Sequence, residues 1–428
     1  MRAILSAPGS RGDVNPMIAI GRRLRAAGHD VVISLAEPYA DVAVDAGLEV
    51  EVVIENEQFT EALGNPHVWK TVRGPLQVFR TVVSEFLERQ RDVIERYHVP
   101  GQTVLVSHPL DLASRIFRDA HPETPLASVH LQPVILRTLD APPKLSGWWF
   151  EMSRPVWLMR TIYWLIDTVA VDPAILGPIN RMRTDYGLER IKRPLNQWWH
   201  SPDLILAMYP DWFAPATKTF LPQLKHCGFP LQDNSSEDFV VPQNRPIVFT
   251  SGTAHHHCRA FFEAAVKACI ELNRPGLLLS TFPENFPAGL PDSVQAMPYR
   301  SFTRLLPHCA AIVHHGGIGT TSQALAAGIP QLIRPMAFDQ FDNASRIEKL
   351  GCGRWLRNDR YLAHELRKIL EKSVETSSGH QMGFRDDGKS LLDHQKSSLK
   401  QGDDDAASHA VGFLENLLAC CNQGDSKI

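Results

Sequence analysis

The spacing of apolar and polar positions predicts strands and helices that alternate along most of the chain. Short apolar runs bounded by Gly, Pro or Asn are typical of buried strands, and apolar residues three or four apart are typical of helices. The series opens with a strand at 2–7, a helix from Pro16 to about Ala27 and a strand at 30–35. This β-α-β order implies a parallel sheet with helices on both faces.

The same pattern continues on both sides of a polar stretch near residues 227–245. Further strands are predicted at 48–53, 104–107, 126–129, 203–208, 247–251, 277–280, 309–313 and 354–356. Further helices are predicted at 39–46, 77–97, 261–272, 302–306, 340–350, after 356 to about 372, and at 406–418.

A chain of 428 residues is long enough for two domains. We predict an N-terminal domain at 1–228, a linker at 229–245 and a C-terminal domain at 246–372. Residues 373–428 are predicted to form a polar segment of poor order followed by a last helix. The predicted fold class is therefore α/β, with two Rossmann-like doubly wound domains facing a cleft.

The segment from about 130 to 197 interrupts the alternation and is rich in Trp, Pro and Arg, with helix-like pieces at 156–169 and 173–186. It predicts either a helical layer over the sheet or a pocket for a large apolar ligand. Charged residues interrupt its apolar run, so a membrane-spanning helix of about 20 residues is not expected. Peripheral membrane contact stays open. The tryptophans proposed to line the pocket are Trp148, Trp149, Trp157 and Trp164.

Composition narrows the class of protein without deciding it. The chain is 44% apolar and has a net charge of -3, with no long basic run, so no nucleic-acid partner is expected. Its seven cysteines are scattered and odd in number, which favours free thiols in a reducing cytoplasm. The first residues are predicted to form a strand rather than a signal peptide.

A strand, a glycine-rich turn and a helix follow one another at 309–328, and Pro330 prevents the helix from continuing. The first turn of a helix presents unpaired backbone N–H groups and a partial positive charge, so it favours an anion, usually a phosphate. Glycines after a strand can also serve tight packing alone. The two histidines before these glycines and the two threonines after them favour a site for a diphosphate.

Two sequence blocks resemble the GT-B glycosyltransferases of family 1, the UDP-glycosyltransferase superfamily, and specifically its bacterial branch of sterol-type and antibiotic-type enzymes. The first block is GSRGDVNP at 9–16 with LRAAGH at 24–29. The second runs from 299 to 340 and contains HHGGIGTT, AAGIPQ and a final Asp-Gln pair. Together with Ser-Gly-Thr at 251–253, the resemblance covers most of 1–370.

The resemblance implies an inverting hexosyltransferase that uses a UDP- or TDP-sugar as donor and a hydroxyl of a hydrophobic small molecule or lipid as acceptor. It implies acceptor binding by the N-terminal domain and donor binding by the C-terminal domain, without cofactor or metal. A departing nucleoside diphosphate would be stabilised by the helix N-terminus. No oligomeric state is predicted.

The resemblance also implies residue roles in the donor site. Residues of the glycine-rich turn would face the diphosphate. The candidates for holding the nucleobase are Tyr299, Arg300 and Phe302. Asp339 and Gln340 would bind sugar hydroxyls unless Asp339 only caps a helix. Gln323 stands where many eukaryotic relatives carry a ribose-binding Glu, so uridine and thymidine both stay open. The predicted donor-binding residues are Ser10, Arg11, Gly12, Gly252, Thr253, Tyr299, Arg300, Phe302, His315, Gly316, Gly317, Gly319, Thr320, Thr321, Gln323, Asp339 and Gln340.

Asp13 is the predicted catalytic base, because the resembling bacterial enzymes use an Asp at this place to deprotonate the acceptor hydroxyl. The ordinary pKa of aspartate, about 3.9, makes it a weak base for an alcohol. We therefore expect burial beneath the acceptor to raise the pKa of Asp13. The alternative role is capping of the helix at Pro16. His108 and His130, each after a predicted strand, are alternative bases.

Other classes of function stay open at this stage. Gly317-Ile318-Gly319 with Asp339 about 20 residues later is a partial dinucleotide fingerprint, which would suit an NAD-dependent oxidoreductase. A sugar-nucleotide epimerase and a non-catalytic nucleotide-sugar-binding protein are further alternatives. Consecutive His255–His257 could suggest a metal site, but neighbouring side chains point in different directions, so no metal is expected.

Overall fold

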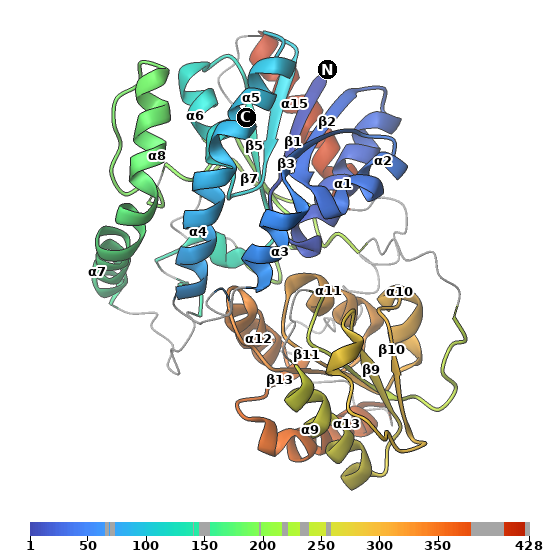
Figure 1. Ribbon diagram of the computed structural model, residues 1–428. Helices are drawn as coiled ribbons and strands as arrows, with labels where there is room; N and C mark the ends of the chain where they lie inside the picture. Colours follow the sequence, from blue (N-terminus) through green and yellow to red (C-terminus); the bar gives the residue numbers. More distant parts are fainter. Residues whose placement is uncertain are drawn as a thin grey trace. The chain divides into compact units, whose positions relative to one another are not determined.

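The computed structural model describes residues 1–64, 68, 73–139, 141–144, 155–196, 198–215, 221–231, 239–253, 258–377 and 406–423. The chain divides into two compact units, Met1–Pro230 with Asp404–Ile428, and Leu231–Asp403. Each unit is built on one parallel β-sheet whose faces are covered by helices (Figure 1). This arrangement agrees with the predicted pair of doubly wound α/β domains.

The sheet of the first unit has the strand order β3-β2-β1-β4-β5-β6-β7, and every neighbouring pair is parallel. Its strands are β1 (Arg2–Ala7), β2 (Asp30–Ala36), β3 (Glu49–Ile54), β4 (Thr103–Ser107), β5 (Leu126–His130), β6 (Leu204–Ala207) and β7 (Leu224–His226). Its helices are α1 (Arg11–Ala26), α2 (Ala40–Asp45), α3 (Asn56–Gly64), α4 (Arg73–Glu85), α5 (Leu87–Tyr97), α6 (Leu112–Ala120), α7 (Val156–Ile166), α8 (Asp172–Asp185) and α15 (Ala406–Gln423).

Apolar side chains on both faces of this sheet explain its position inside the unit. On one face, Ile4 and Leu105 of the strands join a buried cluster with Ile116 of α6 and Ile175 of α8. Helices α1 and α15 lie against each other, with α1 packed on β1 and β2 (Figure 1). Strands buried on both faces are expected to be continuously apolar, and the sequences of β1 and β4 are largely apolar.

The sheet of the second unit has the strand order β10-β9-β8-β11-β12-β13 and is also parallel. Its strands are β8 (Ile247–Thr250), β9 (Gly276–Leu279), β10 (Val294–Met297), β11 (Ala311–His314), β12 (Gln331–Ile333) and β13 (Gly353–Trp355). Its helices are α9 (Arg259–Leu272), α10 (Phe302–Leu305), α11 (Ile318–Ala327), α12 (Gln340–Lys349) and α13 (Leu362–Ser377).

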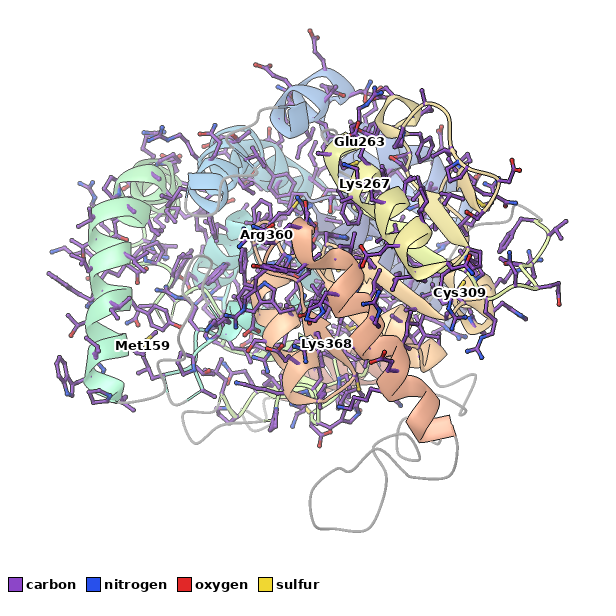
Figure 2. The ribbon with its side chains drawn as sticks, turned by 90° about the horizontal axis from the view of Figure 1, so that it is seen from below. Met159, Glu263, Lys267, Cys309, Arg360 and Lys368 are labelled. Atoms are coloured by element: carbon purple, nitrogen blue, oxygen red, sulfur yellow. The ribbon has the colours of Figure 1, made fainter. Side chains whose placement is uncertain are left out.

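Two clusters of buried side chains lie on this second sheet. One joins Phe249 and Val313 of the strands to α9 and α13, and the other joins Val248 and Ile312 to α10 and α11. Because neighbouring residues of a strand point to opposite faces, these clusters lie on opposite sides of the sheet. The outer surface of α9 carries exposed Glu263 and Lys267, which are labelled in Figure 2.

The helices of the first unit differ from the sequence-based expectations in three places. The first helix begins at Arg11, five residues before the predicted start at Pro16, because the turn around Asp13 is already helical. The predicted helix at 77–97 is two helices, α4 and α5, which meet at Phe86. The predicted helices at 156–169 and 173–186 run together through a π-helical turn at Asp167–Val171.

The joined helix Val156–Asp185 is long and apolar enough to cross a membrane by length and composition, whereas the sequence analysis did not expect a spanning helix. Many core helices meet the same criterion. In the joined helix, the buried Asp167 is paired with Arg137. Ile175 and Ile179 of the same helix belong to the buried cluster on the sheet of the first unit. These contacts show how one side of the helix is attached to the sheet.

The last helix, α15, belongs to the first unit, although the chain reaches it only after passing through the second unit. Glu415 contacts Nε2 of His29 at 2.8 Å, and His409 contacts the carbonyl oxygen of Cys227 at 3.0 Å. Apolar residues of α15, such as Ala410 and Leu414, are fully buried. The helix is therefore a structural component of the first unit.

Gly353 of β13 tests how tightly the second sheet is packed. An added Cβ would overlap the carbonyl oxygen of Gln331 on β12 and would lie 2.8 Å from Cγ2 of Ile347. Gly353→Ala is therefore expected to lower the free energy of unfolding by about 1–3 kcal/mol, as measured by urea denaturation. Gly412→Ala on α15 is the control, since nothing lies within 4 Å of its Cβ. Equal stability of the two variants would contradict the packing described.

Candidate active site

The predicted site residues that follow strands lie at the two places where the sheets reverse their winding. In the first unit β1 and β4 are neighbours, and in the second unit β8 and β11 are neighbours. At such a point successive connections leave toward opposite faces, and a crevice opens beyond the carboxyl ends of the strands. Asp13 and His108 follow β1 and β4, while Gly252 and His315 follow β8 and β11.

Asp13 is held in the first turn of α1 by the residue that precedes the helix. Its Oδ2 accepts hydrogen bonds from the backbone N–H of Ser10 at 2.8 Å and from the Ser10 hydroxyl at 3.1 Å. A Cβ on Gly9 would overlap the Asp13 carboxylate, so this position needs a glycine. The predicted alternative role of Asp13 as a helix cap is therefore present in another form. The helix begins at Arg11 rather than at Pro16, and Asp13, at its third position, forms a capping box with Ser10.

The other oxygen of Asp13 faces a histidine. Oδ1 lies 3.4 Å from Nε2 of His108, and the side chains of Asp13 and His108 are 21% and 7% exposed. The two residues are brought together by the adjacency of β1 and β4. The sequence analysis named them separately, as the predicted base and an alternative base, and the structure makes them partners.

The pKa of Asp13 is lowered, which corrects the expectation that it would be raised. Burial alone would raise the pKa, but the hydrogen bonds from His108 and Ser10 outweigh it. Each of these donors stabilises the ionised form. Asp13 is thus a carboxylate at neutral pH in the protein without ligand.

Other titratable groups surround this pair. Burial, followed by the charge of Asp13, raises the pKa of Tyr39 to about 12, so its phenol stays neutral. His130, at the end of β5, is fully buried, and burial followed by the nearby His200 and His108 lowers its pKa well below the ordinary value. The rings of His130 and His200 lie 5.3 Å apart. His130, the second alternative base, is therefore neutral and nearly inaccessible.

In the second unit, the turn between β11 and α11 is built on a buried histidine. His314 Nδ1 accepts a hydrogen bond from the backbone N–H of Gly316 at 3.1 Å, and its Nε2 lies 3.0 Å from Oε1 of Gln331. Burial lowers the pKa of His314 to about 3, with a smaller contribution from His315. The first histidine of the pair therefore fixes the turn, a role that the sequence analysis did not assign.

The second histidine, His315, lies between two glycines. A Cβ on Gly252 would lie 2.7 Å from its ring, and a Cβ on Gly317 would overlap its Nε2. Gly316 has a φ of 94°, and a Cβ there would lie 2.6 Å from Ile333. Because only glycine allows these approaches, the glycines are required for packing around His315 as well as for any ligand.

The two threonines after the glycines have different surroundings. Thr320 is partly exposed in the first turn of α11, and Gly319 beside it is exposed. Thr321 is fully buried, and its hydroxyl donates to the carbonyl oxygen of Gly317 at 3.0 Å. The predicted phosphate contact of Thr321 stays a prediction that this internal hydrogen bond does not favour.

Asp339 and Gln340 open α12 near the same turn. Asp339 precedes the helix without a side-chain capping bond, and its Oδ2 accepts from Nδ2 of Asn343 at 2.7 Å. The same amide of Asn343 donates to the carbonyl oxygen of Gly316 at 2.9 Å, which ties α12 to the glycine-rich turn. Phe338, just before, has a φ of 55°, an uncommon conformation that is often found at functional sites.

Gln340 has a structural contact that the sequence did not indicate. Its Oε1 accepts from the backbone N–H groups of Met336 and Ala337, at 2.8 and 3.1 Å. The side chain is therefore fixed by the loop before α12, and its oxygen is already used. Only its amide nitrogen is left for the predicted contact with a sugar hydroxyl.

The predicted nucleobase and ribose residues lie around α10. Tyr299 and Phe302 form an edge-to-face pair with ring centroids 5.3 Å apart, and Phe302 is part of the buried core. Arg300 donates to the carbonyl oxygen of Tyr299. The Gln323 amide accepts from the Thr303 hydroxyl and donates to the carbonyl oxygen of Leu231. Its predicted ribose contact stays untested.

The remaining predicted residues are distributed over both units. Ser10, Arg11 and Gly12 lie at the start of α1 in the first unit, whereas the other predicted donor residues lie in the second. Trp157 and Trp164 lie on α7 and are 66% and 49% exposed, so neither is enclosed in the first unit. Trp148 and Trp149 lie outside the described residues.

The three consecutive histidines, His255–His257, also lie outside the described residues. Among the residues that the structure describes, no cluster of His, Cys, Asp or Glu could hold a metal ion.

Comparison with known proteins gives consistent matches. Residues 282–387 match the family model of the erythromycin biosynthesis protein CIII-like C-terminal domain. The chain is 28% identical over 417 residues to O-mycaminosyltylonolide 6-deoxyallosyltransferase of Streptomyces fradiae, covering 88% of this chain and 90% of that protein. It is 27% identical over 409 residues to the sterol 3-beta-glucosyltransferase of Eremothecium gossypii, spanning 88% of this chain but only 32% of that longer protein.

Solved structures confirm the fold. The glycotransferase of kitacinnamycin matches with a TM-score of 0.71 and 18% identity, covering 97% of this chain and 98% of that one. The spinosyn rhamnosyltransferase SpnG complexed with thymidine diphosphate matches with a TM-score of 0.59 and 17% identity, covering all of both chains. These matches support the resemblance of the chain to the GT-B glycosyltransferases of family 1.

This glycosyltransferase has the expected two-domain Rossmann-like fold, and the resemblance stated from its motifs is confirmed. The NAD-dependent oxidoreductase that the partial fingerprint suggested is wrong for this chain. The individual site residues, by contrast, are placed by the structure but not assigned by any relative. Their roles stay predictions.

The buried His314 predicts a pH dependence of stability. It is neutral in the folded protein with a pKa of about 3, whereas an exposed histidine has a pKa near 6.5. The unfolded chain therefore binds one more proton between these values, and stability falls as pH decreases below about 6.5, by up to about 1.4 kcal/mol per pH unit from this residue.

His314→Gln is expected to reduce this slope by up to one proton, because the titrating group is gone while His130 and His200 still contribute. The measurement is the free energy of urea unfolding at several pH values between 7 and 5. Parallel pH profiles for the variant and the parent protein would show that His314 is not held neutral.

Proposed function

We propose that this glycosyltransferase moves a hexose from a UDP- or TDP-sugar to a hydroxyl of a hydrophobic acceptor, with inversion at the anomeric carbon. The observation that carries the proposal is the turn between β11 and α11. There, Gly252 and Gly317 pack closely on His315, Gly316 packs on Ile333, and the backbone reaches the N-terminus of α11. An N-terminus with close backbone and no covering side chain on Gly319 suits a diphosphate.

Two related structures support the choice of ligands. The spinosyn rhamnosyltransferase SpnG was solved with thymidine diphosphate and also with spinosyn aglycone, a large acceptor. The relative from Streptomyces fradiae is named as a 6-deoxyallosyltransferase, so it transfers a deoxyhexose. We therefore favour a nucleoside-diphosphate hexose or deoxyhexose as donor and a large aglycone as acceptor.

In the proposed reaction the acceptor oxygen attacks the anomeric carbon as its proton passes to the Asp13 carboxylate. The bond between the anomeric carbon and the diphosphate oxygen breaks, and the diphosphate leaves with the electron pair. Its added negative charge is stabilised by the N-terminus of α11 and by His315. Asp339 and the amide nitrogen of Gln340 would contact the sugar hydroxyls.

The activity test is a screen of UDP-glucose, other UDP-sugars and TDP-sugars against a panel of hydrophobic alcohols, read by mass spectrometry. Transfer is expected, and NMR of the product is expected to show an inverted anomeric centre. Addition of EDTA is expected to leave the rate unchanged. Conversion of the donor without any acceptor would instead indicate an epimerase, and donor binding without turnover would indicate a non-catalytic protein.

The role of Asp13 is tested with Asp13→Asn, which keeps the shape of the side chain but removes its basicity. Transfer is expected to fall by at least about 100-fold, while donor affinity in a calorimetric titration stays nearly unchanged. Full activity of this variant would remove Asp13 from the reaction.

The role of the glycine-rich turn is tested with Gly317→Ala, whose added Cβ would displace the His315 ring. The affinity for UDP or TDP, measured by calorimetry, is expected to fall at least about tenfold, which corresponds to losing one charge-assisted hydrogen bond. Ala326→Ser, at an exposed position on the same helix, is the control and should bind normally. Unchanged affinity in Gly317→Ala would mean that the diphosphate binds elsewhere.

A further inference from the structure

The pair formed by Asp13 and His108 contains two groups that could each accept a proton from an alcohol. Asp13 Oδ1 lies 3.4 Å from His108 Nε2, and both side chains are largely enclosed. The proposed function names Asp13 as the base, and the following inference rests on that function. The contacts of the imidazole ring of His108 indicate which of the two residues can accept the proton of the acceptor hydroxyl.

The tautomer of His108 follows from its second ring nitrogen. The backbone N–H of Leu110 points at Nδ1 of His108, with a distance of 3.2 Å. A nitrogen that accepts a hydrogen bond carries a lone pair, so the single proton of the neutral ring is on Nε2. The protonated Nε2 is the ring nitrogen that lies 3.4 Å from Oδ1 of Asp13.

His108 therefore has no free lone pair with which to accept the acceptor proton. Its Nδ1 lone pair faces Leu110, and its Nε2 is already protonated. An ionised carboxylate, in contrast, offers about four sites for hydrogen bonds. Asp13 uses three of them, two for Ser10 on Oδ2 and one for His108 on Oδ1. The remaining site on Oδ1 can accept the proton of an alcohol.

The loop that carries His108 is fixed on both sides. The carbonyl oxygen of His108 accepts from the backbone N–H of Asp111 at 2.8 Å, and Asp111 caps α6 through Ser114. The indole N–H of Trp199 donates to the carbonyl oxygen of Pro109 at 2.6 Å. These contacts fix the backbone of the loop, and the Leu110 N–H contact fixes the orientation of the His108 ring.

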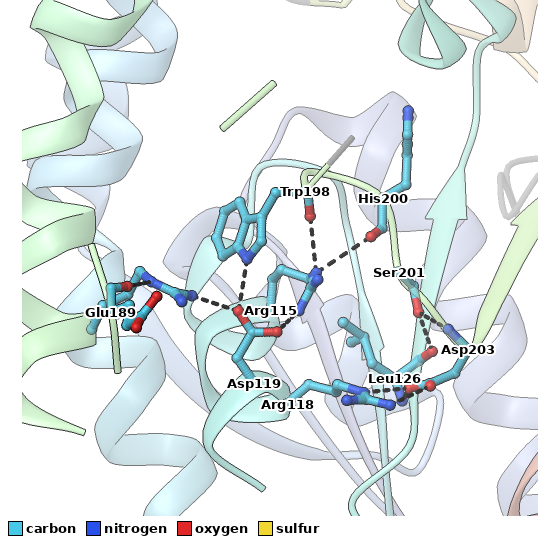
Figure 3. Close-up of polar contacts among 10 residues, drawn as sticks. Arg115, Arg118, Asp119, Leu126, Glu189, Trp198, His200, Ser201 and Asp203 are labelled. Atoms are coloured by element: carbon cyan, nitrogen blue, oxygen red, sulfur yellow. Dashed lines mark hydrogen bonds and ion pairs between the residues drawn. The ribbon is translucent and has the colours of Figure 1, made fainter. Parts of the chain in front are cut away.

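The segment that carries Trp199 is itself anchored to α6. The guanidinium of Arg115 donates to the carbonyl oxygens of Trp198 and His200, and it is paired with Asp119 (Figure 3). The Trp198 indole N–H also donates to Asp119. The position of His108 thus depends on a buried network that contacts neither Asp13 nor any predicted ligand.

We propose that His108 is a positioning residue whose Nε2–H orients the Asp13 carboxylate and keeps it ionised, and that His108 does not itself take the acceptor proton. In the reaction the acceptor O–H bond breaks and its proton passes to Oδ1 of Asp13. The proton on Nε2 of His108 stays where it is.

Other titratable groups face this pair and set the limits of a pH experiment. Tyr39 and Arg11 lie near Asp13, and burial followed by the Asp13 charge keeps the Tyr39 phenol protonated. His130 lies near His108 and is neutral because burial lowers its pKa, and Asp111 borders the loop. Tyr39 and His130 therefore do not titrate between pH 5 and 8, so neither would obscure a change in the pH profile of a His108 variant.

The test compares His108→Gln and His108→Leu in transfer assays. The probes are UDP-glucose or TDP-glucose with whichever hydrophobic alcohol gives the highest rate with the parent protein. Glutamine places an N–H donor near the position of Nε2 and is expected to keep activity within about tenfold of the parent. Leucine removes the donor and is expected to lower kcat/KM by about 10- to 100-fold, with the acidic limb of the pH profile moved upward by about one unit.

The direction of that shift follows from the contacts. Without the N–H of His108, the ionised form of Asp13 loses stabilisation and its pKa rises, so the base becomes protonated at a higher pH. Donor affinity and the unfolding temperature of both variants serve as controls for correct folding. If His108→Gln loses as much activity as Asp13→Asn, or if His108→Leu keeps the parent's rate and pH profile, the positioning role is wrong.

A second measurement does not require turnover. The ¹⁵N chemical shifts of the imidazole nitrogens distinguish the two neutral tautomers, and the His108 signals are identified by their absence in His108→Gln. The Nε2-protonated tautomer is expected at pH 7.5. An Nδ1-protonated ring would overturn the inference even if the transfer reaction is confirmed, whereas failure of every donor to react would count against the proposed function alone.

Discussion

Both candidate sites depend on one property of doubly wound parallel sheets, which is that the winding reverses at one pair of neighbouring strands. At this pair the two connections leave toward opposite faces, so the space beyond the strand ends is not filled by the sheet's own helices. The pair is β1 and β4 in the first unit and β8 and β11 in the second. The residues that follow these four strands are the ones that carry the proposed chemistry.

The two reversal points have opposite electrostatic character. In the first unit the side chain that follows β1 is a carboxylate, kept ionised by Ser10 and His108. In the second unit the chain after β11 presents the N-terminus of α11, a region of partial positive charge. The carboxylate after β1 suits a group that gives up a proton, and the N-terminus of α11 suits a group that gains negative charge. A glycosyl transfer generates both.

The fold and the glycine-rich turn could be predicted from the sequence because both are encoded locally. Strands such as β1 and β4 are short continuous apolar runs, and adjacent glycines indicate the turn before α11. Strands β7 and β12, of three residues each, were not predicted because so short a run gives no periodicity, although a strand was predicted at the equally short β13. The start of α1 was misplaced because Pro16 was taken as the first-turn residue, whereas it lies inside the helix.

The relations between site residues could not be predicted, since they depend on tertiary contacts. Asp13 and His108 are far apart in the sequence, and only the pairing of β1 with β4 brings them together. The expectation of a raised pKa considered burial alone and omitted the donors that the fold supplies. In the same way, the buried contacts of Gln340, Thr321 and Gln323 are invisible in a motif that lists only residue types.

A base with a lowered pKa is a reasonable solution for this reaction, although it gives up intrinsic basicity. The alcohol becomes acidic only as its oxygen bonds to the anomeric carbon, so the proton can be transferred late, to a weak base that is already in place. What the site must then provide is a carboxylate that is always ionised and always aimed at the same point. The contacts of Ser10 and His108 serve both requirements, because the hydrogen bonds that fix the geometry of Asp13 also stabilise its charge. Position, rather than basicity, is therefore the property that this part of the structure maintains.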